Sequence, residues 1–83
     1  MTQYSVDDYP VRYAAFLELL RQARIDADLT QEDVAHILGK SQSYVSRSEH
    51  GERRVDIVEL QVFAQIYRKP LSFFLPEELN KEL

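Results

Sequence analysis

The sequence predicts an all-α fold, and three observations support this prediction. Apolar residues recur at i, i+3, i+4 and i+7, the spacing of the buried face of an amphipathic helix. Residues suited to capping helices stand next to these stretches. The 83 residues include only two glycines and three prolines, so few positions interrupt a helix. We therefore expect a compact bundle of five helices over residues 11–76, with a flexible arm at 1–10 and a tail at 77–83.

The first predicted helix spans about residues 11–27, after Pro10. Its apolar stripe consists of Tyr13, Phe16, Leu17, Leu20 and Ala23. Arg21 and Arg24 lie towards its C-terminal end, where the helix dipole favours positive charge. The pattern is that of a helix packed on one side.

Residues 30–51 predict two short helices joined by a tight turn. The first spans 31–38, between a threonine and Gly39, and the second runs from Gln42 to about residue 50, between a serine and Gly51. Serine and threonine cap helix starts, and glycine adopts the left-handed conformation that ends helices. Only three residues separate the two helices, which must therefore cross at a steep angle. This arrangement is a helix-turn-helix.

Two further helices are predicted after this pair. Residues 57–67 form the fourth, because Asp56 and Glu59 have the spacing of a capping box. Its core positions are Leu60, Phe63, Ala64 and Tyr67. Pro70 suits the first turn of a fifth helix.

The charge of the chain is unevenly distributed. The formal net charge is −4, but residues 40–54 carry four basic and two acidic side chains, against six basic and twelve acidic ones elsewhere. Such segregation permits a basic face on an acidic protein. The pattern allows an anionic partner and predicts modest non-specific affinity for it.

The second helix of the pair presents a polar outward face. This face carries Gln42, Ser43, Tyr44, Ser46 and Arg47. An ordinary exposed helix carries long Lys/Glu pairs, whereas in a major groove glutamine pairs with adenine and arginine with guanine. The residues that we expect to read bases are Gln42, Ser43, Ser46 and Arg47. Arg47 could hold a phosphate instead, and serine can contact either base or backbone.

Four segments carry a family resemblance. They are LRQAR at 20–24, LTQEDVA at 29–35, LGKSQSYVSRSEHG at 38–51 and LQVFAQIYRKPLSFFL at 60–75. Over residues 13–75 the chain resembles the Cro/repressor (XRE-type) helix-turn-helix family. The resemblance implies a lambda repressor-like domain of five helices that binds double-stranded DNA. It also implies a homodimer on a palindromic operator, acting as a transcriptional regulator, in most cases a repressor.

Further residues are expected at the DNA backbone, and the resemblance itself places Arg53 and Arg54 in a loop that grips phosphate in this family. The expected phosphate contacts are Gln31, Lys40, Tyr44, Arg53 and Arg54. For the cations the alternative is solvated charge, and for Tyr44 it is a purely structural role. In this family an arginine at the Arg24 position pairs with a glutamate at the Glu49 position, and we expect the same ion pair.

The chain departs from the family pattern at two positions. Asp28 stands where glycine is usual, so this corner should be strained or differently shaped. Ser48 stands where Ile, Leu or Val is usual. Serine there either leaves slack or lets a large neighbour such as Phe63 fill the gap.

The C-terminal stretch is apolar for a chain end. Exposed apolar surface of this kind usually marks an interface. The residues that we expect at a dimer interface are Phe73, Phe74, Leu75 and Leu79. The alternative is a protein-interaction module, such as an antitoxin that binds a partner protein through this tail.

Other function classes find little support in the sequence. There is no cysteine, and the only histidines, His36 and His50, have no ligand set around them, so we expect no metal and no cofactor. No nucleophile–base pattern is present, and we expect no enzymatic activity or small-molecule substrate. No apolar run approaches the length of a membrane span, and no signal peptide is recognisable. The expected location is cytoplasmic.

Overall fold

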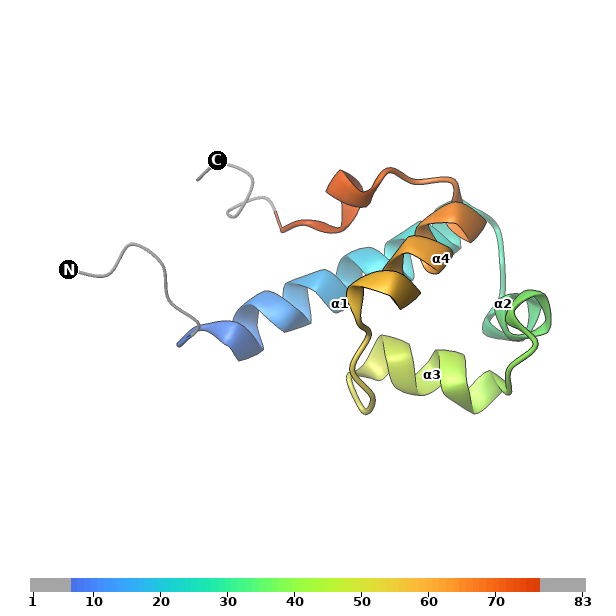
Figure 1. The fold of residues 1–83 in the computed structure, drawn as a ribbon, viewed down its shortest axis with the longest axis horizontal. Helices are drawn as coiled ribbons and strands as arrows, with labels where there is room; N and C mark the ends of the chain where they lie inside the picture. The colour runs from blue at the N-terminus through green and yellow to red at the C-terminus, as the bar shows by residue number, and fades with distance from the viewer. Residues whose placement is uncertain (1–6, 77–83) are drawn as a thin grey trace.

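The computed structural model describes residues 7–76, which form four α-helices and one short 3-10 helix. These are α1 (Tyr9–Asp26), α2 (Gln31–Leu38), α3 (Gln42–His50), α4 (Ile57–Tyr67) and the 3-10 helix η1 (Leu71–Phe74). The described part of the chain contains no strand, and the predicted all-α class is confirmed. In Figure 1, α4 lies against the long helix α1, α2 lies at one end, and α3 runs along the lower edge.

Helix α1 begins at Tyr9, two residues earlier than expected. Pro10 lies in its first turn, where the missing N–H would have had no helical partner, so the proline starts this helix rather than ending the arm. At the other end, Asp28 adopts a left-handed φ of 61°. Aspartate tolerates this conformation better than most non-glycine residues, which is how the corner forms without glycine.

Helices α2 and α3 have the predicted bounds because local hydrogen bonds fix their ends. The Thr30 hydroxyl accepts from the Asp33 N–H at 3.0 Å, and the Asp33 carboxylate accepts from the Thr30 N–H at 2.8 Å. The hydroxyl that caps α3 belongs to Ser41 and accepts from the Tyr44 N–H at 3.2 Å. Gly39 ends α2 with a φ of 68°, which turns the chain sharply into α3.

The fifth predicted helix is corrected to a single turn of 3-10 helix, η1. Leu75 has extended backbone angles, with φ −87° and ψ 125°. Pro76 follows it, and a proline disfavours the helical conformation of the residue before it. The chain therefore leaves the helical conformation after one turn.

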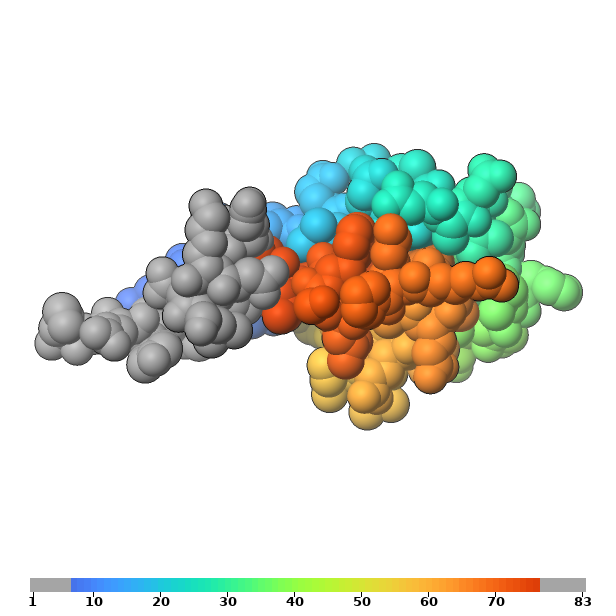
Figure 2. All heavy atoms as spheres, turned by 90° about the horizontal axis from the view of Figure 1, so that it is seen from above, coloured from blue at the N-terminus to red at the C-terminus, as the bar shows by residue number. Residues whose placement is uncertain are grey.

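The core lies between α1, α4 and the helix pair. Its buried apolar residues are Leu20, Ala23, Val34, Ala35, Val45, Phe63, Ala64, Tyr67 and Phe74. Phe74 was expected at a dimer interface, but it is 1% exposed and belongs to this core, which corrects that expectation. Figure 2 shows the orange and red part of the chain, which carries Phe63 and Phe74, packed against α1.

The two glycines of the helix pair provide a matched test of this packing. Both have positive φ, 68° at Gly39 and 80° at Gly51, but a Cβ at Gly51 would lie 3.0 Å from Leu17 Cδ1, whereas one at Gly39 would meet nothing within 4 Å. We expect Gly39→Ala to cost about 1 kcal/mol for the left-handed backbone, and Gly51→Ala about 2 kcal/mol because Leu17 must also move. Urea unfolding of both variants measures the difference. Equal losses would show that Leu17 accommodates the methyl group freely.

Candidate nucleic-acid interface

Helix α3 presents the predicted base-reading residues on its outer side. Gln42, Ser43 and Arg47 are exposed, and Ser46 is half-buried, with its hydroxyl 3.3 Å from His50 Nδ1. The inner side of the helix is occupied by Val45, Ser48 and Glu49, all buried. Within residues 7–76, the outer face of α3 is therefore open to a ligand.

An ion pair between Arg24 and Glu49 joins the inner side of α3 to α1. Arg24 Nε donates to Glu49 Oε2 at 2.6 Å and Arg24 Nη2 to Glu49 Oε1 at 3.2 Å, while Arg24 Nη1 donates to the Leu29 carbonyl at 2.9 Å. The Glu49 side chain is only 2% exposed. A carboxylate buried this deeply requires a charged partner, and the two-pronged geometry suits the planar guanidinium.

The ion pair continues to the surface through two glutamines. Gln31 Nε2 donates to Glu49 Oε1 at 3.1 Å, and Gln42 Nε2 donates to Gln31 Oε1 at 3.3 Å. This chain of hydrogen bonds orients the amide of Gln42 at the start of α3. The predicted phosphate ligand Gln31 thus also contacts the predicted base reader Gln42.

A second polar cluster joins α3 to α4, and it consists of Tyr44, Ser48, Arg53 and Glu59. The Tyr44 hydroxyl donates to Glu59 Oε2 at 2.7 Å, and the Ser48 hydroxyl donates to the Tyr44 carbonyl at 2.8 Å. Arg53 Nη1 donates to the Ser48 hydroxyl at 3.1 Å, and Arg53 Nη2 donates to Glu59. Ser48 is fully buried, and its hydroxyl is satisfied by hydrogen bonds to the Tyr44 carbonyl and from Arg53, which the sequence did not predict.

Arg54 has quite different neighbours from Arg53. Its guanidinium lies over the rings of Tyr9 and Tyr13, 5.0 and 4.5 Å from their centroids, and these two rings stack on each other. The Tyr13 hydroxyl accepts a hydrogen bond from the Val55 N–H at 3.0 Å, which fixes the loop to α1. Arg54 remains exposed. Its guanidinium is oriented by the rings and free to meet an anion.

Lys40 is the remaining predicted phosphate contact. It is exposed in the turn between α2 and α3, with its Nζ 5.5 Å from the centroid of the Tyr44 ring. Arg47 and Arg54 are exposed as well, so three cations in or directly after the helix pair are accessible to an anion.

Of the residues expected at a dimer interface, Leu79 lies outside the described residues, Phe73 is half-buried, and Leu75 is 37% exposed.

The pKa of Glu59 is strongly perturbed. Burial alone would raise it, but hydrogen bonds from the Asp56 N–H, the Tyr44 hydroxyl and Arg53 outweigh burial and lower the pKa to about 2. The pKa of the Tyr44 hydroxyl is raised, by burial and then by its bond to Glu59. The cluster therefore holds an ionised carboxylate and a neutral phenol.

Sequence reasoning missed Glu59 as a partner of α3. The capping box identified this residue, but only Oε1 serves the cap, accepting from the Asp56 N–H at 2.9 Å. The tyrosine stack beneath Arg54 was also missed. Its only signal was the i, i+4 spacing of Tyr9 and Tyr13, which sequence analysis assigned to an arm and to the apolar stripe.

Two findings concern other kinds of site in residues 7–76. No group of three or more His, Cys, Asp or Glu side chains is placed to hold a metal ion. No helix in this range is both long and apolar enough to span a bilayer.

Comparison with known proteins identifies the family. A family model described as helix-turn-helix matches residues 20–74, which include all of α2, α3 and α4. The chain belongs to the Cro/repressor (XRE-type) helix-turn-helix family. This Cro/repressor-type protein is therefore a DNA-binding transcriptional regulator, with α3 as the second helix of the motif. Searches of curated proteins and of solved structures found no match.

The buried ion pair leads to a stability prediction. Arg24→Met leaves the Glu49 carboxylate buried without its cation, and we expect a loss of about 3 kcal/mol in the free energy of unfolding. The double variant Arg24→Met/Glu49→Met removes both charges and should recover most of this loss. Urea unfolding of the two variants measures both effects. A double variant that is no more stable than Arg24→Met would contradict this account.

The low pKa of Glu59 leads to a pH prediction. A carboxyl group with a folded pKa of about 2 stabilises the fold above its ordinary value of 4.5 and loses this contribution as the pH falls towards 2. Allowing for partial solvent exposure, we expect about 1.5 kcal/mol from this source. Between about pH 5 and about pH 2, the free energy of unfolding measured with urea should fall less steeply with decreasing pH for Glu59→Gln than for the unaltered protein. If the free energies of unfolding of the two proteins changed in parallel with pH, Glu59 would not contribute to the pH dependence of stability.

Proposed function

We propose that this regulator represses transcription as a homodimer, with α3 of each copy reading one half of a palindromic operator. The observation that carries the proposal is the exposed polar face of α3, held by the ion pair beneath it. Gln42 and Arg47 supply the groups that pair with adenine and guanine in a major groove. Ser43 and Ser46 complete the base-reading face, and Gln31, Lys40 and Arg54 hold phosphates beside it.

An exposed apolar surface on α4 and η1 supports the homodimer. Val58 is 63% exposed, Val62 39%, Leu71 40% and Leu75 37%. The described surface of α4 carries one charged side chain, Glu59, and that carboxylate is engaged with α3. Two copies of an acidic protein can approach through an uncharged face without repulsion, and apolar groups suit a two-fold interface.

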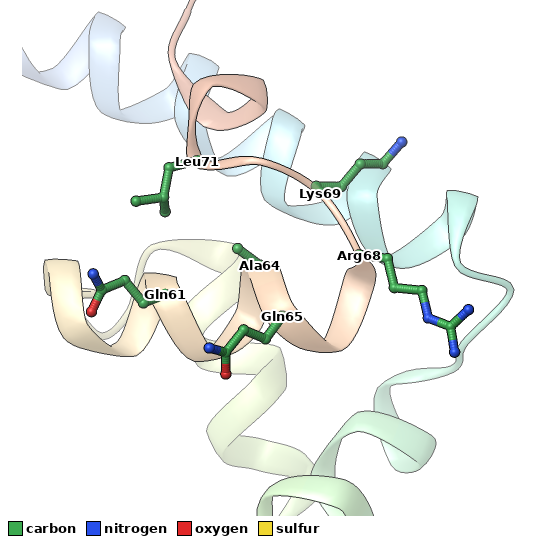
Figure 3. A pocket seen from close by; sticks show the side chains of 6 residues that line it. All are labelled: Gln61, Ala64, Gln65, Arg68, Lys69 and Leu71. Atoms are coloured by element: carbon green, nitrogen blue, oxygen red, sulfur yellow. The ribbon is translucent and has the colours of Figure 1, made fainter.

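A hollow of about 440 Å³ lies beside this surface, between α4 and the segment leading to η1. It is lined by Gln61, Ala64, Gln65, Arg68, Lys69 and Leu71. In Figure 3 the charged ends of Arg68 and Lys69 point away from Leu71, so the end of the hollow near Leu71 is lined by uncharged side chains. Glutamine amides both donate and accept, so Gln61 and Gln65 can pair with their own copies across a two-fold axis.

Replacing Arg47 tests whether α3 reads bases. Arg47→Ala should weaken binding to DNA from upstream of the protein's own gene by about 10- to 100-fold, the cost of removing one bidentate pair of hydrogen bonds to guanine. Arg21→Gln is the control, because it removes the same charge from an exposed position on α1, away from the proposed base-reading and dimer residues. Fluorescence anisotropy at fixed salt measures both. If the two variants bind alike, the assignment of α3 to the groove fails.

The second prediction concerns the dimer. Leu71→Lys puts a charge on the apolar surface and should weaken dimerisation on the order of 100-fold, roughly 3 kcal/mol. Ile37→Lys is the control, since Ile37 is 56% exposed on α2. Sedimentation velocity measures the populations of monomer and dimer. An unaltered protein that sediments only as a monomer would refute the homodimer and favour a different protein as the occupant of this surface.

A further inference from the structure

The two adjacent arginines after α3 face opposite environments. The Arg53 guanidinium donates to Glu59 and to Ser48, and its Cζ lies 4.2 Å from the centroid of the Tyr44 ring. Its side chain is 30% exposed. Arg54 lies on the outer side, over Tyr9 and Tyr13. Equal charge and adjacent positions therefore do not give these residues equal access to an anion.

Glu59 is the centre of the arrangement around Arg53. One of its oxygens accepts from the Asp56 N–H, and the other accepts from the Tyr44 hydroxyl and from Arg53. A single carboxylate thus connects the first turn of α4, the first turn of α3 and the intervening loop. Charge-assisted hydrogen bonds of this kind are about twice as strong as neutral ones.

We propose that Arg53 and Glu59 are positioning residues that set α3 against α4, and that Glu59 holds Arg53 away from the DNA backbone, leaving Arg54 as the phosphate-binding arginine of this loop. The proposal rests on the DNA-binding function and refines it. It replaces the initial expectation that Arg53, Arg54 and the Tyr44 hydroxyl all contact phosphate.

The cost of releasing Arg53 supports this assignment. To reach a phosphate, its guanidinium would have to leave Glu59, Ser48 and the face of the Tyr44 ring. The Glu59 carboxylate would then lose its cation, and the buried Ser48 hydroxyl would lose its donor. Arg54 needs no such exchange, because aromatic rings orient its guanidinium without using its N–H donors.

The salt dependence of DNA binding distinguishes the two arginines. The slope of log K against log salt is negative, and removing one phosphate-binding cation reduces its magnitude by about 0.9. With a short labelled duplex of mixed sequence as probe, Arg54→Gln should reduce the magnitude of the slope by about 0.9 per bound protomer. Arg53→Gln should weaken binding by the same factor at every salt concentration and leave the slope unchanged. A slope reduced equally by both variants would overturn the proposal.

A conservative variant separates positioning from charge. Arg53→Lys keeps the charge but lacks the planar fork that reaches Glu59 and Ser48 together. We expect it to bind DNA as weakly as Arg53→Gln, whereas Arg54→Lys should retain most of the binding. Rescue of binding by Arg53→Lys would identify Arg53 as a phosphate contact and overturn the proposal.

A measurement without DNA tests the cluster itself. The unfolding free energies of Arg53→Gln, Glu59→Gln and the double variant form a cycle, and we expect the double variant to lose clearly less than the two single losses combined. Additive losses would overturn the proposal. If the unaltered protein fails to bind the duplex at any salt concentration, the DNA-binding function itself is refuted, an outcome distinct from equal slopes.

Discussion

The ion pair between Arg24 and Glu49 is the interaction on which the rest of this structure depends. It joins the last turn of α1 to the last turn of α3, and it does so in the interior, where Glu49 is 2% exposed. Burying a carboxylate carries a large desolvation cost, which two bonds from Arg24 and one from Gln31 offset. Such a pair contributes more to geometry than to net stability, because its bonds are satisfied in one arrangement only. This ion pair therefore helps to set the orientation of α3 relative to α1.

The polar cluster around Glu59 constrains the other side of the same helix. Glu49 joins α3 to α1 through Arg24, whereas Tyr44 joins α3 to α4 through Glu59. An apolar side chain at residue 48 would fill the same space without fixing the orientation of α3, since dispersion contacts are not directional. Hydrogen bonds to Glu59 and Arg53 are directional, so they fix the rotation of α3 about its own axis. Rotation decides which side chains point outward.

Local chemistry made most of the fold predictable from the sequence. The starts of α2, α3 and α4 and the glycine ends of α2 and α3 follow from caps within four residues, and the structure has them at the predicted positions. Errors arose where a distant or subtle constraint decided the outcome. Phe74 was assigned to an interface from composition, but packing against α1 buries it. The fifth helix ended early because of a neighbouring proline. The partners of Arg53 could not be foreseen, because the contact with Glu59 requires the angle between α3 and α4 that only tertiary packing supplies.

The division of roles between the arginines bears on how an acidic protein can select one DNA site. Non-specific affinity grows with the number of phosphates neutralised, and it competes with the specific site at every other position of a genome. With a net charge of −4 and Arg53 held by Glu59, the protein offers few cations to the DNA backbone. In the proposed homodimer, discrimination between DNA sites rests on the outer face of α3 and on the joining of two such faces, because a second half-site increases the affinity for the specific site. Such a protein needs a rigidly oriented α3, because it has few electrostatic contacts with DNA that could compensate for a misplaced helix.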